Sequence, residues 1–219
     1  MPGLPALIQL EGRRCLVVGG GAVAVRRARA LIEAGGSVRV VAPRIDDALA
    51  AMPVAMAWRG FEPGDLDGVF FVVSAADAAA VNEAVAKEAR QRGVLVNRAD
   101  RPEAGDVSIP AHRRIGPITL AVDTGGVSAA AAAKIRDSVA RSIDPAWPVL
   151  LEAAKPWRIE IQQRFPDDAS RRAALLRVLT DPRAMAILEH RGIDALRAHW
   201  RRMIHGAASD AAESNDSDA

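Results

Sequence analysis

The sequence predicts an α/β fold in which a doubly wound parallel sheet is followed by a small α+β segment and an all-helical region. Through the first hundred residues, short apolar runs of strand length alternate with amphipathic helical segments. Three glycines, Gly19–Gly21, separate the first run from the first helix. Beyond residue 110 the alternation gives way to a hairpin pattern and then to arginine-rich helices.

The first three elements form one β-α-β unit. The strand at Arg14–Val18 is an apolar run, and the helix at Ala22–Ala34 carries alanine and leucine on one face and arginine on the other. Gly35 and Gly36 end this helix, and a second strand follows at Ser37–Val41. Because a helix connects the two strands, they are expected to be parallel.

The remaining elements are assigned from the same patterns. Further strands are expected at Val54–Trp58, Val69–Ser74 and Val94–Asn97, with a helix at Ala78–Arg92. Strands at Asp106–Ile109 and Ile118–Val122, with a turn at Gly116-Pro117, lead to a helix at Ser128–Ile143. From Ala146 the chain is helical with breaks at Pro156, Pro166 and Pro182, and the acidic tail 207–219 is expected to be disordered.

Composition excludes several classes of protein. Of the 219 residues, 50% are hydrophobic and 26% are charged, which is typical of a globular chain. No run reaches the ~18 apolar residues of a membrane span, and the first residues lack the pattern of a signal peptide. Cys15 is the single cysteine and lies in an apolar run, so we expect a buried structural thiol and a cytoplasmic protein. Aromatic residues make up 4%, which argues against an aromatic nucleic-acid platform.

Charge is unevenly distributed along the chain. Residues 1–111 are neutral overall, whereas residues 112–206 carry 16 Lys and Arg against 10 Asp and Glu, a net charge of +6. A basic segment of this kind suits an anionic partner, either a nucleic acid or a small polycarboxylate. A solvated helical face would explain the same charge.

The glycine cluster fits the pattern G-x-G-x-x-A of Rossmann-like dinucleotide-binding domains. Gly19 permits a tight turn, and Gly21 lets a pyrophosphate approach the backbone at the start of the helix. Ala24 permits close packing of helix on strand. The alternative is a glycine-rich structural turn. The cofactor stays open between NAD and NADP, because Asp46 and Asp47 come late for a ribose contact and Arg44 could meet a 2′-phosphate.

Asp100 is the candidate catalytic residue. It follows the strand at 94–97, and ligands of such sheets bind outside the carboxyl ends of the strands. There it could accept a proton while a hydride leaves for the cofactor. The alternative is a loop carboxylate paired with Arg98 or Arg101.

The glycine-containing turn at 123–128 and the four histidines are further candidate sites. The turn at 123–128 could hold an anion through its backbone N–H groups, or could be a flexible turn with a helix cap. No metal site is expected, because His112, His190, His199 and His205 lack zinc-ligand spacing. Motifs of serine hydrolases and P-loop kinases are absent as well.

Three segments together resemble the precorrin-2 dehydrogenase/sirohydrochlorin ferrochelatase family, the N-terminal module of siroheme synthase. They are CLVVGGGAVAVRRARALIEAG at 15–35, VLVNRADRPEAGDVSIPA at 94–111 and ITLAVDTGGVSAAAAAKIRDSV at 118–139. The resemblance implies an NAD-binding domain at 1–111, a dimerisation segment at 112–145, a helical domain at 146–206 and a homodimer. It implies oxidation of the anionic tetrapyrrole precorrin-2 to sirohydrochlorin by NAD⁺, followed in some members by Fe²⁺ insertion.

The resemblance also assigns residues. It makes Asp100 the general base. It places the cofactor at Gly19, Gly21, Ala22, Val23, Pro43 and Arg44, and the substrate at Thr124, Gly125, Gly126, Ser128, Arg113 and Lys134. Asp123 departs from the family pattern by adding a negative charge where an anionic substrate is expected. Thr124 replaces a serine that is phosphorylated in some members, and a methyltransferase module is missing from the 219 residues.

Other functions stay open at this stage. One is a protein that only inserts the metal, and another is a dehydrogenase of an unrelated anionic substrate. A third is an NAD-sensing or DNA-binding regulator, suggested by the arginine-rich helices, although they show no clear helix-turn-helix spacing. Neither a membrane nor a nucleic acid is an expected partner of the leading function.

Overall fold

The computed structural model describes residues 3–165 and 167–216, with side chains up to Ile204. The chain divides into two compact units. The first is Met1–Pro110 together with Asp123–Ala129, and the second is Ala111–Val122 together with Ala130–Ala219. The first break lies within one residue of the predicted boundary at 111, and the loop after the hairpin belongs to the first unit.

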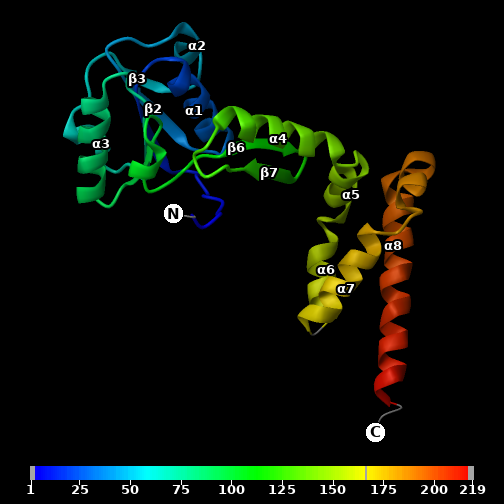
Figure 1. The fold of residues 1–219 in the computed structure, drawn as a ribbon. Coiled ribbons are helices and arrows are strands. Elements are labelled where there is room, and N and C mark those ends of the chain that lie inside the picture. Colours follow the sequence, from blue (N-terminus) through cyan, green and yellow to red (C-terminus); the bar gives the residue numbers. More distant parts are fainter. Residues whose placement is uncertain (1–2, 166, 217–219) are drawn as a thin grey trace. The chain divides into compact units, whose positions relative to one another are not determined.

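The first unit contains a five-stranded parallel sheet with the order β3-β2-β1-β4-β5 (Figure 1). Its strands are β1 Arg14–Val18, β2 Ser37–Val41, β3 Ala55–Ala57, β4 Phe71–Ser74 and β5 Leu95–Arg98. The order reverses between β1 and β4, which creates the switch point at which such sheets bind ligands. The predicted doubly wound sheet is confirmed, and β1 and β2 have the predicted bounds.

Helices cover both faces of this sheet. They are α1 Ala22–Glu33 and α3 Ala79–Gln91, with the short α2 Asp47–Ala50 and the 3₁₀ turns η1 Pro63–Leu66 and η2 Pro102–Ala104. Successive side chains of a strand point to opposite faces. Accordingly, Cys15 and Val17 of β1 pack in one core with α1, whereas Leu16 and Val18 pack in a second core with α3.

The buried position of Cys15 confirms the expected structural thiol, and burial raises its pKa to about 11. The thiol is therefore protonated at neutral pH, which is unfavourable for a nucleophile.

The predicted strand at Asp106–Ile109 is wrong. The strand is β6 Ala111–Ile115, which pairs antiparallel with β7 Ile118–Val122. The backbone N–H groups of Asp106 and Val107 both donate to Val96 O, at 2.8 and 3.1 Å, so this stretch is held against β5. The turn at Gly116-Pro117 does form, and it fixes the pairing of Ile115 with Ile118.

The second unit is helical beyond its hairpin. Its helices are α4 Ala129–Ser142, whose first residue belongs to the first unit, α5 Ala146–Ala154, α6 Trp157–Arg164, α7 Asp168–Leu179 and α8 Ala184–Asp216. Trp157, Leu196 and Trp200 are buried in its own apolar core. Gly192, at φ +80°, interrupts α8. Pro156 precedes α6 and Pro182 lies between α7 and α8, as expected, whereas Pro166 lies outside the described residues.

The expectation of a disordered tail is wrong for residues 207–216. The backbone of α8 continues through Asp216. The physical reason is local, because this stretch is rich in alanine, the residue with the highest helix propensity. Residues 217–219 lie outside the described part of the chain. Among the helices of the described residues, none is both long and apolar enough to cross a membrane.

Candidate functional site

The glycine turn after β1 is tightly enclosed by the neighbouring strand ends. Gly19 has φ +126°, and a Cβ there would lie 2.3 Å from Ala75 O, just beyond β4. A Cβ at Gly20 would lie 1.9 Å from Arg44 O, just beyond β2. Neither position has room for a side chain, so the turn requires glycine for packing as well as for conformation.

Gly21 differs from the other two glycines because a Cβ there would meet nothing within 4 Å. It is the N-cap of α1, and no side chain caps the helix. The first turn of α1 contains no acidic residue. The backbone N–H groups at this helix end therefore face an open space with a favourable dipole, an arrangement that fits a phosphate group.

The end of β2 supplies the second part of the predicted cofactor site. Pro43 and Arg44 are exposed directly after the strand. Asp46 accepts a hydrogen bond from Ala48 N at 2.8 Å and caps α2, so its carboxylate is already engaged. Arg44 is thus the charged side chain nearest in sequence to the end of β2.

The loop carrying Asp100 is folded back against β5. Asn97 Nδ2 donates to Val107 O at 2.8 Å, and Asp106 Oδ2 accepts from Val96 N at 3.2 Å. At Gly105 a Cβ would lie 2.9 Å from both Arg98 N and Val96 O. These contacts close the loop of residues 98–105 at its base, next to the carboxyl end of the strand.

Asp100 forms a two-point ion pair with Arg98. Arg98 Nε donates to Asp100 Oδ1 at 2.9 Å, and Arg98 Nη2 donates to Oδ2 at 2.8 Å. The guanidinium is 2% exposed and the Asp100 side chain is 33% exposed. Of the two partners considered from the sequence, the structure selects Arg98, because Arg101 lies 3.8 Å from Glu103 instead.

Two residues of α3 complete the network. Glu83 Oε2 accepts from Arg98 Nη1 at 2.7 Å. Asn82 Oδ1 accepts from Ser74 Oγ at 2.7 Å and from Ala76 N at 3.0 Å, and Asn82 Nδ2 donates to Ala76 O at 2.8 Å. The start of α3 is thereby fastened to the end of β4. Asn82 and Glu83 are not among the site residues predicted from the sequence. A polar residue on the inner face of a predicted helix is a signal that would have indicated Asn82.

The network sets the protonation state of Asp100. The hydrogen bonds from Arg98 are the largest of the effects that together lower the pKa of Asp100 to about 2, against the opposing effect of burial. Asn82 makes a smaller contribution in the same direction. The same contacts raise the pKa of Arg98 and lower that of Glu83. Asp100 is therefore a carboxylate throughout the neutral range.

The predicted anion-binding turn lies in the first unit. Thr124 Oγ1 accepts from Ser128 N at 3.3 Å and donates to Ser128 O at 3.1 Å, which closes the turn before α4. Gly125 and Gly126 have φ angles of +62° and +81° and are exposed, and Asp123 is exposed as well. The Thr124 hydroxyl is thus already used within the turn.

Arg113 and Lys134 lie in the second unit, whereas Asp100 lies in the first. Both are exposed. Arg113 Nη1 is 3.8 Å from Asp137 Oδ1. Their predicted contact with substrate stays a prediction.

Comparison with known proteins shows which proteins this chain resembles. Residues 6–111 match the model of a family of NAD(P)-binding domains. The siroheme synthase of Pseudomonas entomophila is 36% identical over 211 residues, covering 94% of this chain and 45% of that protein. The siroheme synthase of Chromobacterium violaceum is 37% identical over 221 residues, covering 97% of this chain and 46% of that protein. The chain is similar in sequence to part of the siroheme synthases. It spans a little under half the length of these relatives.

A solved structure shares the fold of this chain. The structure of "SirC, precorrin-2 dehydrogenase" matches with a TM-score of 0.69 and 24% sequence identity, covering 91% of this chain and all of that chain. At this identity the match shows the fold. It agrees with the predicted order of an α/β domain followed by a helical region.

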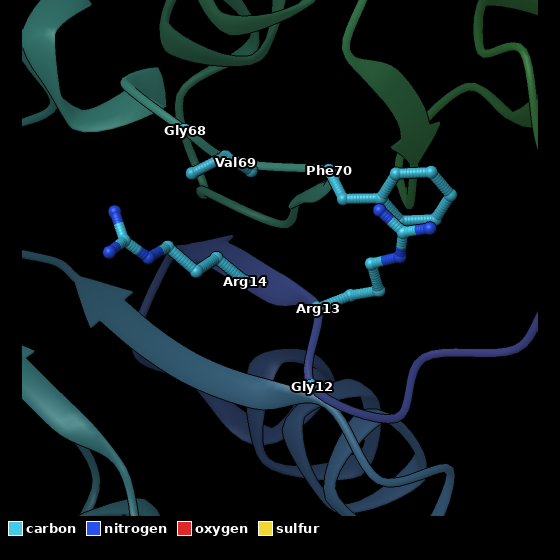
Figure 2. Close-up of a pocket in the computed structure, with 6 residues that line it drawn as sticks. All are labelled: Gly12, Arg13, Arg14, Gly68, Val69 and Phe70. Carbon is cyan, nitrogen blue, oxygen red and sulfur yellow. The ribbon is translucent and has the colours of Figure 1, made fainter.

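A separate pocket lies at the end of the parallel sheet where the strands begin (Figure 2). Its volume is about 380 Å³, and its lining consists of residues that precede or begin β1 and β4: Gly12, Arg13, Arg14, Gly68, Val69 and Phe70. The Arg13 guanidinium lies 5.0 Å from the centre of the Phe70 ring. Parallel strands all begin at this edge, so the pocket is distinct from the glycine turn and Asp100, which follow strand ends.

Among the described residues, no group of three or more His, Cys, Asp and Glu side chains could hold a metal ion. The candidate site consists of an open helix N-terminus that fits a phosphate group and a carboxylate held by Arg98.

Proposed function

We propose that the chain is an NAD-dependent dehydrogenase that oxidises precorrin-2 to sirohydrochlorin in siroheme biosynthesis. One observation carries the proposal: the open helix end at Gly21 and the ionised carboxylate of Asp100 both follow strands of one parallel sheet, at its carboxyl edge. The names of the siroheme synthases and of the precorrin-2 dehydrogenase neighbour support this substrate.

The reaction removes one hydride and one proton from the tetrapyrrole. Bound NAD⁺ supplies the hydride acceptor. Asp100 receives the proton, because it is ionised at neutral pH and each of its oxygens keeps a lone pair beyond the one facing Arg98. Its partial exposure to solvent lets the proton pass on to water.

The cofactor contacts belong to this proposal. We assign the pyrophosphate to the backbone of Gly19, Gly21, Ala22 and Val23, and the adenosine ribose to the neighbourhood of Pro43 and Arg44. NAD is preferred on the family resemblance. Arg44 makes this preference testable, because a guanidinium at this place would also accept the 2′-phosphate of NADP.

The remaining assignments are also proposals. The tetrapyrrole carboxylates are assigned to the turn of Thr124, Gly125, Gly126 and Ser128 and to Arg113 and Lys134. The basic charge of residues 112–206 favours such a substrate. We further propose a homodimer formed through residues 112–145, a cytoplasmic location on the evidence of the single cysteine, and Fe²⁺ as a second substrate.

The test is an anaerobic assay with precorrin-2 and NAD⁺, in which reduced nicotinamide and the tetrapyrrole spectrum are followed together. We expect NADH and sirohydrochlorin to appear in equal amounts. Asp100→Asn should lower kcat by about 100-fold or more while dinucleotide affinity stays unchanged, since general-base catalysis contributes about 10²–10⁴-fold.

Asp67→Asn is the matched control. Asp67 is an exposed carboxylate of the same unit, it precedes β4 at the opposite edge of the sheet, and its partner Arg92 keeps Glu88. Full turnover in Asp100→Asn would remove Asp100 from the mechanism. No turnover in the wild type with either NAD⁺ or NADP⁺ would refute the proposed reaction.

Metal insertion is tested separately, with sirohydrochlorin and Fe²⁺ in the absence of NAD⁺. A rate of siroheme formation equal to the uncatalysed rate would exclude it. This assay needs no hydride acceptor, so its result is independent of the dehydrogenase assay.

A further inference from the structure

We infer that Arg98 is a positioning residue for the proposed reaction and that it fixes the orientation of the Asp100 carboxylate through both oxygens. The inference rests on the proposed function. From the sequence, pairing of Asp100 with Arg98 was the alternative to a catalytic role for Asp100. Here the ion pair and the catalytic role are parts of one arrangement.

Arg98 uses all three of its guanidinium nitrogens on carboxylates: Nε and Nη2 on Asp100, at 2.9 and 2.8 Å, and Nη1 on Glu83, at 2.7 Å. The planar guanidinium matches the plane of the Asp100 carboxylate, so the pair fixes its rotation as well as its position. The remaining lone pairs of Asp100 point away from the guanidinium and can accept a proton.

Arg98 is itself held in place by the elements around it. Its side chain is buried at 2% exposure, at the last position of β5. The next residue is paired to the sheet, with Ala99 N donating to Ser74 O at 2.9 Å. Glu83 anchors the guanidinium from α3, and neighbouring Asn82 fastens the start of that helix to β4. Two strands and one helix therefore orient this arginine, which is what a preorganised site requires.

Few charged side chains surround Asp100 among the described residues. Arg98 belongs to β5, Glu83 and Arg90 to α3, and Arg101 and Glu103 to the loop and turn that follow Asp100. Arg90 and Arg101 act on Glu83 through their charges. Removing Arg98 would thus take away the one cation that contacts Asp100 in the described part of the chain.

Asp100 is therefore a weak base that is already ionised, and so able to accept a proton, at neutral pH. The pKa of Asp100 is lowered to about 2, so the group is ionised at every pH above that value. We expect the rate of the wild-type enzyme to show no loss from Asp100 protonation between about pH 4 and 7. A variant without the guanidinium should lose rate as pH falls through the ordinary aspartate range, near ~4.

The experiment titrates the Asp100 carboxyl carbon by NMR in the full chain, in the wild type, Arg98→Met, Arg98→Lys and Glu83→Gln. Arg98→Met should raise the titration midpoint by about 2 pH units, toward the ordinary value of aspartate. Glu83→Gln is the matched control, because it removes a partner of Arg98 and leaves the Arg98–Asp100 pair; its midpoint should move by less than half as much.

Activity separates orientation from charge. Arg98→Lys retains a cation but cannot bind both oxygens in one plane. We expect a low titration midpoint in Arg98→Lys, a fall in kcat of about tenfold or more, and an unchanged KM for NAD⁺. A merely structural role would change the unfolding midpoint without this separation of kcat from KM.

The measured midpoints and rates test the ion pair, the orienting role and the proposed function separately. An Asp100 midpoint that is near ~4 in the wild type, or equal in the wild type and Arg98→Met, overturns the inference. Full kcat in Arg98→Lys overturns the orienting role. If Arg98→Met does not fold, the wild-type midpoint and Arg98→Lys still decide. A wild type that does not oxidise precorrin-2 refutes the proposed function, and the titration still tests the pair.

Discussion

At the scale of single residues, Gly20 and Gly21 of the glycine turn are needed for different physical reasons. Gly20 is surrounded by backbone, since a Cβ would lie 1.9 Å from Arg44 O, whereas Gly21 faces open space. Gly20 is required by packing within the protein. On the proposed function, Gly21 is required by a ligand. The motif G-x-G-x-x-A specifies Gly21 but leaves the position of Gly20 open, so the packing requirement at Gly20 is seen only in the structure.

This difference yields a matched pair of substitutions. Gly20→Ala should lower the free energy of unfolding by roughly 2–4 kcal/mol, because backbone atoms must move to admit the methyl group. Gly21→Ala should cost no more than about 1 kcal/mol, yet weaken NAD⁺ binding about tenfold or more, because its Cβ enters the space assigned to the pyrophosphate. Urea unfolding and calorimetric titration measure the two effects. Unchanged affinity in Gly21→Ala would show that no phosphate approaches this residue.

At the scale of elements, the connection between α7 and α8 depends on one buried carboxylate. Asp181 Oδ2 lies 2.5 Å from His199 Nε2 of α8, and Asp181 Oδ1 accepts from Arg183 N and Nε, both at 3.2 Å. Burial raises the pKa of Asp181, but the bonds from His199 and Arg183 outweigh it, so the net shift is downward. The charged form of Asp181 therefore stabilises this connection.

The direction of the shift gives a pH prediction. A lowered pKa means that Asp181 contributes stability above the unfolded value, near ~4, and that this contribution is lost as pH falls through the lower folded value. Asp181→Asn should reduce the free energy of unfolding by about 1–3 kcal/mol at pH 7 and make it less steep in pH below ~4. Asp194→Asn, on the same α8 and 93% exposed, is the control. Identical acid unfolding curves for wild type and Asp181→Asn would contradict this assignment.

At the scale of the whole molecule, the chain holds separate hydrophobic cores. Those of the parallel sheet are built from β1, β2, β4, β5, α1 and α3, and that of the helical region from α5 to α8. The two compact units can therefore differ in stability and respond differently to a ligand.

A nucleotide should stabilise one unit selectively. Trp58 belongs to the first unit, whereas Trp147, Trp157 and Trp200 belong to the second, so fluorescence of Trp58→Phe reports on the second unit. NAD⁺ at about 100 times its Kd should add about 2.7 kcal/mol to the first unit. The circular dichroism transition should then shift while the fluorescence transition stays in place. An equal shift of both signals would mean that the units unfold as one.

Much of the architecture is determined by local sequence. The observed bounds of β2 agree with the prediction because Gly36 and Pro43 enclose an apolar run. The position of the turn after β1 is also predictable, because its backbone conformation and close packing require glycine. The strand at Asp106–Ile109 failed because its backbone donors are taken by Val96, a partner ten residues away that apolar periodicity does not reveal.

The state of the candidate catalytic group was decided by tertiary structure. The position of Asp100 after a strand followed from the sequence, and so did a choice of two arginines as partners. Only the fold buries Arg98 beneath Glu83 of α3 and turns it onto both oxygens of Asp100. The reason is that a charged side chain can be buried only where opposite charges meet it, and these come from elements that the chain brings together only on folding.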